Sequence, residues 1–189
     1  MYTFTTLPIE LVYRILDHLT DFTLFYSMQN VSEGFNQILN IYHRYQTLTT
    51  LNLWDNRIGE QGAQHIGDAL RRNTTLTTLD LWNNRIGEQG AQHIGDALRI
   101  NTTLTTLNLR DNQIAHQGAQ HIGDALRTNT TLTTLNPRGS NQIAHQGAQH
   151  IGDVLRTNTT LTTLNLECNR IGKQGAEYLR NILGNRVIF

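Results

Sequence analysis

Hydrophobic positions recur at a fixed spacing along most of the chain. Five leucines stand in register and are separated by 28, 28, 28 and 29 residues: Leu48, Leu76, Leu104, Leu132 and Leu161. Each opens the pattern Leu-Thr-Thr-Leu-x-Leu, in which alternate residues are apolar, except that the last Leu of the fourth unit is replaced. Alternation of this kind predicts a short strand with one buried face. A fixed period of this length predicts a repeat architecture.

The second half of each unit has the spacing of a helix. In the first unit Ala63, Ile66 and Leu70 recur at i, i+3 and i+7, which predicts a helix with one stripe buried against the strands. Small residues such as Gly67 allow neighbouring elements to approach closely. One strand and one helix in each unit of about 28 residues predict an α/β solenoid over residues 48–189.

Asparagine recurs at two places in the units. The first set stands two residues before an isoleucine, where the chain bends, and we expect its amides to form a structural ladder by hydrogen-bonding freed backbone groups: Asn56, Asn84, Asn112, Asn141 and Asn169. The second set lies in Asn-Thr-Thr glycosylation sequons: Asn73, Asn101, Asn129 and Asn158. Because the sequence indicates no secretion, this second set is interpreted as loop residues only.

The fourth unit is irregular, and the tail departs from the period. Pro137 replaces a core Leu and one residue is added, which predicts a shortened or distorted strand, locally more mobile, followed by an intact helix. A bulge at Gly139-Ser140 would return Asn141 and Ile143 to their places. Phe189 falls 28 residues after Leu161, so the tail either begins a sixth strand there or folds back as a cap.

The pattern Leu-x-x-Leu-x-Leu-x-x-Asn-x-Ile, followed by Gly-Ala-x-x-Ile, resembles the ribonuclease-inhibitor class of leucine-rich repeats. The resemblance covers the chain from Leu48 onward. It implies a curved solenoid that acts as a protein-binding scaffold, since this class serves inhibitors, innate sensors and ubiquitin-ligase receptors alike.

Residues 1–47 carry no repeat and allow two interpretations. They form a helical cap over the first core layer, or they form a three-helix F-box, which the start Leu7-Pro8-Ile9-Glu10-Leu11 resembles. The F-box resemblance implies binding to a Skp-type adaptor of a cullin ubiquitin ligase through Leu7, Pro8, Glu10, Leu11, Ile15, Val31 and Phe35. Phe35, where many F-boxes have Trp, and Gly34 inside the third helix depart from that family. The protein is then a substrate receptor, or, in the alternative, a stand-alone binding or inhibitor protein of the ribonuclease-inhibitor or innate-sensor type.

Composition narrows the compartment and the partners. Fifteen basic residues balance 15 acidic ones without forming a basic stripe, so no nucleic-acid partner is indicated. The apolar stretch 7–19 is interrupted by Glu10, Arg14 and Asp17, which argues against a signal peptide or a membrane span. The single cysteine, Cys168, excludes an internal disulfide and fits a reducing compartment. We therefore expect a cytoplasmic or nuclear protein.

No residue pattern indicates catalysis, a cofactor or a metal. His65, His93, His121 and His150 recur in successive helices, each with Asp three residues later. Helices pack roughly 8 to 10 Å apart, whereas zinc ligands lie within about 2.2 Å of the metal. We therefore expect only weak local His–Asp pairs. Neither a strained serine elbow nor a phosphate-binding loop is present, and the chain is predicted not to be an enzyme.

Residues after the last inward Leu of each strand vary while the framework repeats. They are predicted to face the concave side and to bind a target protein, with the residue that follows each: Trp54, Asp55, Trp82, Asn83, Arg110, Asp111, Arg138 and Glu167. Cys168 continues the second column. Trp and Arg dominate interface hot spots. Units one and two differ at only three of 28 positions, so the alternative is that Trp82 is merely a copy of Trp54.

Overall fold

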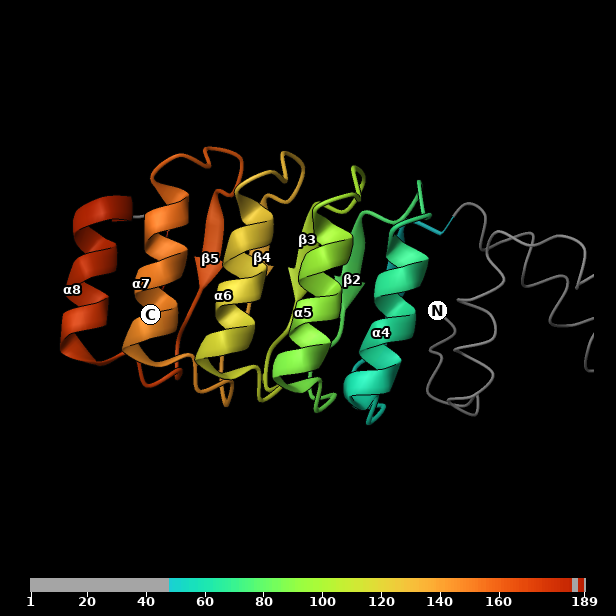
Figure 1. Ribbon diagram of the computed structural model, residues 1–189, viewed down its shortest axis with the longest axis horizontal. Helices are drawn as coiled ribbons and strands as arrows, with labels where there is room; N and C mark the ends of the chain where they lie inside the picture. The colour runs from blue at the N-terminus through green and yellow to red at the C-terminus, as the bar shows by residue number, and fades with distance from the viewer. Residues whose placement is uncertain (1–47, 185–186, 189) are drawn as a thin grey trace, which may run out of the picture.

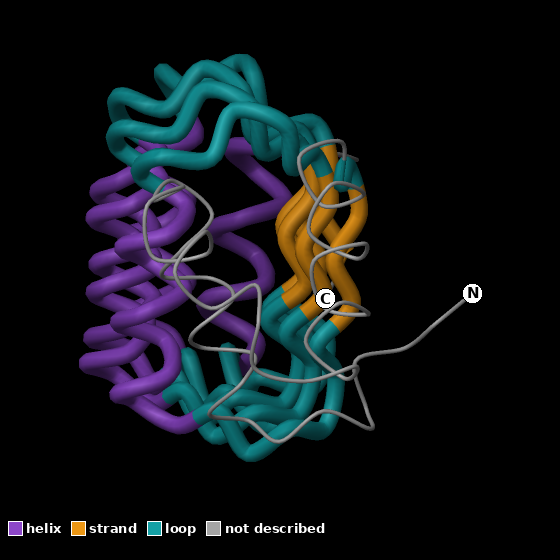
Figure 2. Tube along the Cα trace, turned by 90° about the vertical axis from the view of Figure 1, so that its right-hand side faces the viewer, coloured by secondary structure: helices purple, strands orange, loops and turns teal. Residues whose placement is uncertain are grey.

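The computed structural model describes residues 48–184 and 187–188, which form a stack of strand–helix units. Six parallel strands pair in chain order in one sheet. The strands are β1 (Thr50–Asn52), β2 (Thr78–Asp80), β3 (Thr106–Asn108), β4 (Thr134–Asn136), β5 (Thr163–Asn165) and β6 (Val187–Ile188). The helices are α4 (Gly59–Leu70), α5 (Gly87–Leu98), α6 (Ala115–Leu126), α7 (Ala144–Leu155) and α8 (Gly172–Leu183). Figures 1 and 2 show the helices in one layer and the sheet in a second layer facing it.

This arrangement confirms the predicted α/β solenoid of alternating strands and helices. The expected module of residues 1–47 lies outside the described residues. So do all of its proposed adaptor contacts, Leu7, Pro8, Glu10, Leu11, Ile15, Val31 and Phe35.

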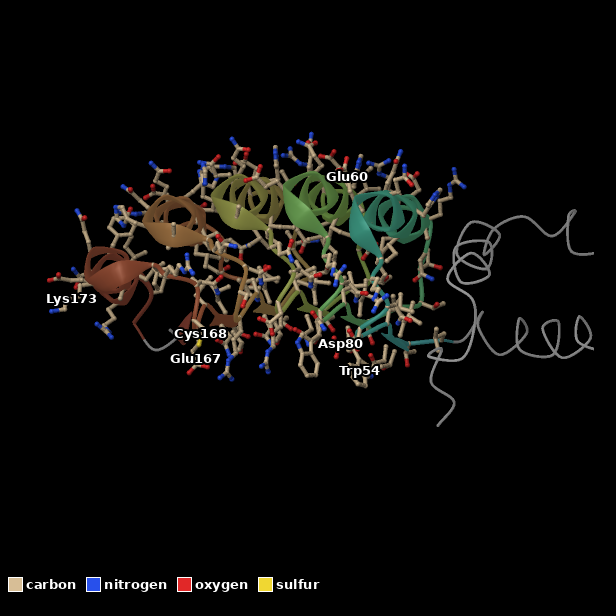
Figure 3. The ribbon with its side chains drawn as sticks, turned by 90° about the horizontal axis from the view of Figure 1, so that it is seen from below. Trp54, Glu60, Asp80, Glu167, Cys168 and Lys173 are labelled. Atoms are coloured by element: carbon tan, nitrogen blue, oxygen red, sulfur yellow. The ribbon has the colours of Figure 1, made fainter. Side chains whose placement is uncertain are left out.

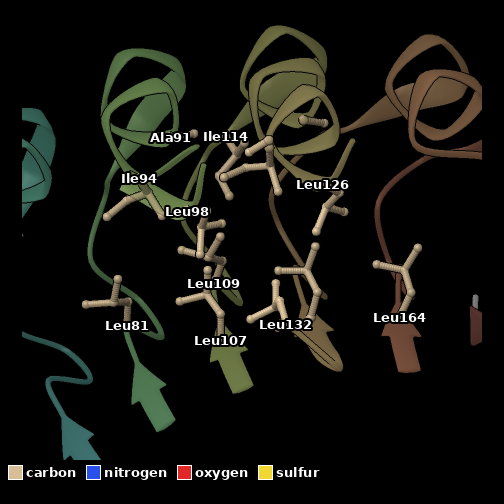
Figure 4. Packing of buried hydrophobic residues seen from close by; sticks show 14 of the residues in the cluster. Leu81, Ala91, Ile94, Leu98, Leu107, Leu109, Ile114, Leu126, Leu132 and Leu164 are labelled. Atoms are coloured by element: carbon tan, nitrogen blue, oxygen red, sulfur yellow. The ribbon is translucent and has the colours of Figure 1, made fainter. Parts of the chain in front are cut away.

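The strands are short because each contributes one inward leucine between two outward polar residues. In β1, Leu51 is buried while Thr50 and Asn52 are exposed, and Leu51 pairs with Leu79 of β2. Equivalent leucines therefore stack from unit to unit and fill the space between sheet and helices, as the close view of Leu81, Leu107 and Leu109 shows (Figure 4). The alternation in the sequence thus places one continuous core along the whole solenoid.

The helices bury the stripe that the sequence predicted, and they lie close together. Ala63, Ile66 and Leu70 of α4 are all buried. A side chain built at Gly67 would bring its Cβ to 2.8 Å from the carbonyl oxygen of His93 on α5. Gly95 has the same relation to His121 on α6, so glycine at this position is required by the approach of the neighbouring helix.

The predicted asparagine ladder is present, and it joins neighbouring units. Asn84 Oδ1 accepts the N–H of Asn56 at 2.9 Å. Its Nδ2 donates to the carbonyl of Leu53 in the unit before and to Leu81 in its own. One unit later, Asn112 Oδ1 accepts the N–H of Asn84, and its Nδ2 donates to the carbonyl of Leu81 in the unit before. Each buried amide thus satisfies bend groups of two units at once.

The second asparagine set also forms a ladder, although the sequence was interpreted as placing these residues in loops only. Asn101 is 4% exposed, and its Nδ2 donates at 2.8 Å to the carbonyl of Leu70, the last residue of α4. Its Oδ1 accepts the N–H groups of Thr103 and Leu104. The Asn therefore satisfies a carbonyl that a helix end leaves without a partner. Asn129 and Asn158 do the same for the next two helices.

The Pro137 strand is predicted from the sequence to be shortened or distorted and locally more mobile. The shortening is wrong, the distortion is confirmed by the lost pairing with β5, and the mobility stays a prediction. β4 has three residues, like β3, because the proline follows the last strand residue. In units one to three the residue at this place donates its N–H to the next strand, as Leu109 does to Asn136 at 2.9 Å. Pro137 has no N–H, so one bond and the pairing of Asn136 with β5 are missing. Backbone bonding resumes at Gly139, whose N–H donates to Glu167.

The residue added at Gly139-Ser140 leaves the later residues of unit four in register, as predicted, but it changes one hydrogen bond of the first asparagine ladder. Asn141 Oδ1 accepts the N–H of Asn112 at 2.8 Å, and α7 is complete. The N–H of Asn141, however, donates to Gly139 rather than to the next asparagine. The Oδ1 of Asn169, a residue only 1% exposed, consequently has no hydrogen-bond partner. The insertion therefore interrupts the ladder at a single point.

The tail forms a strand, but not in the register that the period predicted. Val187 pairs with Leu164 and Ile188 with Asn165. Val187 follows its partner by fewer residues than one repeat, because Gly184, with φ of 55°, closes α8 and the chain returns at once to the sheet. The sixth strand therefore lies before Phe189 rather than beginning there.

We predict that Pro137→Leu combined with deletion of Ser140 stabilises the protein. The double change supplies the missing N–H of the proline position and returns the N–H of Asn141 to Asn169 Oδ1. Satisfying one buried acceptor and adding one hydrogen bond is expected to outweigh the loss of the exposed hydrogen bond from Ser140 N–H to Asp111, and to raise the free energy of unfolding by about 1 kcal/mol. Urea denaturation and amide hydrogen exchange over residues 134–143 measure the effect. Pro137→Leu alone, which leaves the bulge in place, is expected to give the smaller gain. An unchanged or lower midpoint in the double variant contradicts this account.

Candidate functional site

A row of side chains follows the inward leucines along the strand side of the solenoid. It comprises Trp54, Trp82, Arg110, Arg138 and Glu167, and we call it the strand-face row. Trp54 and Glu167 lie on the strand side of the molecule, whereas Glu60 and Lys173 lie on the helix side (Figure 3). Seen from this direction, the helices form the outside of a shallow arc and the strands its inside.

The two tryptophans and an arginine form a continuous stack. The ring centroids of Trp54 and Trp82 are 5.5 Å apart with an angle of 19° between the planes. The guanidinium carbon of Arg110 lies 4.8 Å from the centroid of Trp82. Trp54 is 39% exposed, but Trp82 is half-buried because its two faces are covered by its neighbours. Trp54 is therefore available to a partner, whereas Trp82 is only partly so.

Asp111 fixes the position of this stack. Its Oδ2 accepts the Trp82 indole N–H at 3.1 Å and the Arg110 Nε–H at 3.1 Å. Its Oδ1 accepts the backbone N–H of Ser140, the inserted residue, at 2.6 Å. A Cβ at Gly139 would overlap Asp111 Oδ1, and Gly139 has φ of 92°, so only glycine fits at that position. The irregularity of unit four thus holds the carboxylate that orders the stack.

The surroundings of Asp111 favour its ionised form. Partial burial would raise the pKa of the carboxyl group. Hydrogen bonds from the Ser140 N–H, the Trp82 indole and Arg110 outweigh burial and lower the pKa below its ordinary value. The carboxylate is therefore ionised at neutral pH, when it can accept from all three donors.

The other predicted members of the face lie beside the stack. Arg138 Nε and Glu167 Oε2 form an ion pair at 3.1 Å. Asn83 Nδ2 donates to Asp55 Oδ1 at 2.8 Å. Each predicted target-binding residue thus contacts another member of the predicted set. Cys168, which continues the second column, is exposed.

Three residues of this face were missed in the sequence: Asp80, Gly139 and Ser140. Asp80 Oδ1 accepts the backbone N–H of Trp82 and the side-chain Nδ2 of Asn108. It is one of the few positions at which units one and two differ, and that difference was a signal for it. Gly139 and Ser140 were interpreted as a bulge that only restores register, and no sequence signal indicated their contact with Asp111.

On the helix face, the expected local His–Asp pairs are not the ones formed. Each Asp instead lies beside the Arg three residues later, as Asp124 does with Arg127 at 3.2 Å. His150 Nε2 lies 2.9 Å from Asp124 Oδ1, on the preceding helix. The close approach of helices across Gly123 allows this contact between units.

Within the described residues, no group of three or more His, Cys, Asp or Glu could hold a metal ion, and no helix is long and apolar enough to cross a membrane.

We predict that Asp111→Asn destabilises the protein at neutral pH but not in acid. Asn can accept at only one of the two oxygen positions, so its NH₂ group would face at least one donor, which costs about 1 to 2 kcal/mol. Because folding lowers the pKa of Asp111, its contribution is fully present above the ordinary value near 4. That contribution is lost as the pH falls through the folded-state value. Denaturant unfolding of both proteins at a series of pH values from 7 down to the acid limit of folding, at equal ionic strength, follows the difference. A difference that does not decline at any pH below the ordinary value contradicts the assignment.

Solved structures of other proteins have a similar arrangement. The chain is similar to a structure titled "Leiomodin-1 Actin-Binding Site 2 (ABS2)", with 25% identity and a TM-score of 0.65, over 82% of this chain and 90% of that one. It is also similar in fold to the tropomodulin C-terminal domain from Caenorhabditis elegans, with 11% identity and a TM-score of 0.63, over 82% of this chain and 93% of that one. A search of curated proteins found no match.

Family models agree with these similarities. A leucine-rich repeat model matches residues 157–179, which run from the end of unit four into α8. The model described as "TMOD/LMOD Leucine-rich domain" matches residues 36–150, more than half of the chain. The chain therefore belongs to the TMOD/LMOD leucine-rich domain family.

Proposed function

We propose that the strand-face row binds a partner protein and that actin is the partner to test first. The match of residues 36–150 to the TMOD/LMOD leucine-rich domain carries this proposal. The similarity to a structure whose title names an actin-binding site supports actin as the candidate. The role is that of a non-catalytic binding scaffold without a cofactor, and the expected cytoplasmic or nuclear location stays a prediction.

The geometry of the face suits protein binding. Trp and Arg are the residue types that most often contribute large binding energies at interfaces. The Trp82 ring is already held by Trp54, Arg110 and Asp111. A side chain that is fixed before binding loses less conformational entropy in the complex. The row is therefore a pre-ordered patch rather than a set of mobile surface residues.

The substrate-receptor interpretation is a second candidate, and it depends on residues 1–47. The start Leu7-Pro8-Ile9-Glu10-Leu11 favours it. The matched family models include no F-box, and the TMOD/LMOD match begins at residue 36, inside this segment. The comparisons therefore favour the binding scaffold without an adaptor-binding module.

We predict that the full chain binds actin through the strand-face row. Fluorescence anisotropy with labelled monomeric actin, and cosedimentation with filaments, measure binding to the two forms. Trp82→Ala removes the centre of the stack and is expected to cost about 2 kcal/mol or more, roughly a thirtyfold loss of affinity. Trp54→Ala is expected to weaken binding in the same direction.

Ile100→Thr provides a matched control for these variants. Ile100 is 58% exposed and follows α5, away from the row, and the corresponding position in units three and four is Thr. The affinity of the Ile100→Thr variant for actin is expected to equal that of the wild type. If the folded wild-type chain binds neither form of actin, actin is not the partner. If binding occurs but both tryptophan variants retain it, the strand-face row is not the site.

The second candidate has its own test. If residues 1–47 form an F-box, the full chain binds a purified Skp-type adaptor in a pull-down, and Leu11→Asp abolishes that binding. Circular dichroism of the variant controls for loss of helix. Absence of adaptor binding by the folded wild-type chain at micromolar concentration removes the receptor interpretation and leaves the actin test unaffected.

A further inference from the structure

We propose that Trp54 and Asp55 together bind an arginine side chain of the partner protein. The guanidinium stacks on the Trp54 ring and donates an N–H to the Asp55 carboxylate. This inference names the chemistry of the partner and rests on the proposed function of the strand-face row. Its test uses a peptide, so it can succeed or fail independently of actin.

The chain already contains the arrangement that the proposal invokes. Arg110 stacks on Trp82 at 4.8 Å, and the Arg110 Nε–H donates to Asp111 Oδ2. The same oxygen accepts the ring N–H of Trp82, which belongs to the preceding unit. An acidic residue that directly follows a member of the strand-face row therefore accepts a hydrogen bond from the row member of the preceding unit.

The first unit repeats two of these three components. Asp55 corresponds to Asp111, with nearly the same φ, 58° against 54°. Trp54 takes the place of Arg110 as the residue before the Asp, so the arginine of the partner would take the place of Trp82, one unit back along the row. Asp55 is exposed. Its Oδ1 accepts the side-chain amide of Asn83, and Oδ2 has no hydrogen-bond partner among residues 48–184. Asp111 directs its Oδ2 toward a donor one unit back. We therefore expect Asp55 Oδ2 to face a guanidinium N–H of an arginine stacked on the side of the Trp54 ring away from Trp82.

The charges around the two tryptophans favour a cation. Arg110 and Arg138 are paired with Asp111 and Glu167. In contrast, no ion pair within the described part of the chain includes Asp55 or Asp80, which flank the tryptophan pair. At the tryptophan end of the row, Asp55 therefore presents a carboxylate without an ion-pair partner among the described residues, next to the exposed Trp54 ring. Such a site attracts a cation both to the ring face and to the carboxylate.

Arginine fits this site better than other side chains do. Its planar guanidinium can stack on an indole while its N–H groups donate to a carboxylate in the same plane. The lysine ammonium is a compact, strongly hydrated charge that cannot stack. A neutral aromatic side chain would cover Trp54 but would leave Asp55 partly desolvated without a donor. The site is therefore predicted to select arginine over lysine, and both over a neutral side chain.

The test is a peptide titration of the full ¹⁵N-labelled chain followed by NMR. The chain has two tryptophans, so the indole N–H region contains two signals, which Trp54→Phe assigns. Acetyl-Gly-Arg-Gly-amide is expected to shift the Trp54 signal saturably at millimolar concentration, with a smaller change at Trp82. The citrulline peptide, equal in shape but uncharged, is expected to bind about tenfold more weakly or not measurably. The lysine peptide is expected to lie between the two.

Two variants with the same change of charge separate the site from general electrostatics. Asp55→Asn keeps an acceptor for Asn83 and installs the residue that unit two has at this place. It is expected to weaken arginine binding about fivefold or more. Glu60→Gln removes one negative charge on the helix side (Figure 3) and is expected to leave the affinity unchanged.

Three outcomes overturn the proposal. One is equal binding of the arginine and citrulline peptides, which indicates stacking without recognition of charge. The second is equal loss in Asp55→Asn and Glu60→Gln, which indicates general electrostatics. The third is a Trp54 indole NMR signal that does not shift with the peptide, together with tryptophan fluorescence that acrylamide does not quench. That result means that another part of this chain covers the ring. Loss of actin binding in the earlier test affects none of these readouts.

Discussion

Every bend in this solenoid exposes backbone groups that only the next unit can satisfy. The Oδ1 of Asn84 accepts N–H groups of the unit before it, and the N–H of Gly59, where α4 begins, donates to the carbonyl of Asn84. At the other end of the helix, Asn101 donates to the final carbonyl of α4. A buried backbone group without a partner costs about 1 to 3 kcal/mol. One unit alone would leave several such groups unpaired, so the units are stable only as a stack.

The same constraint determines the spacing of the strand face. Parallel strands joined in register bring equivalent residues to about 4.8 Å from each other, which is close to the distance at which aromatic rings stack. Trp54 and Trp82 are therefore placed in contact by the backbone, and their centroid distance of 5.5 Å needs no special loop. The residues that differ between units at this one repeat position therefore lie side by side and form a continuous surface. In this chain the surface changes from stacked aromatic rings to ion-paired Arg138 and Glu167.

Features that depend on one unit, or on its repetition, could be predicted from the sequence, whereas contacts between particular side chains of different units could not. The inward leucines and the buried helix stripe were predictable because both follow from local periodicity. That Pro137 lies just after the last residue of β4 could not be predicted, because the apolar pattern does not define how many residues each strand has. The second asparagine ladder could not be inferred either, because an Asn-Thr-Thr motif is equally typical of an exposed loop. The His–Asp expectation failed because a helical pattern does not show which of two neighbours, Arg127 or His121, an Asp will face.

The irregular fourth unit explains why the site lies where it does. In a regular unit the N–H at the ladder position donates to the next asparagine, whereas here it donates to Gly139, and the inserted Ser140 directs its own N–H to Asp111. The insertion therefore leaves Asn169 Oδ1 without a partner but gives Asp111 a third donor. A carboxylate with three donors remains ionised, and that charge holds Arg110 over Trp82. A fully regular array would have satisfied Asn169 and left Asp111 with only its own Arg and the ring N–H. A local defect in the core ladder and an ordered surface stack are thus two results of the same added residue.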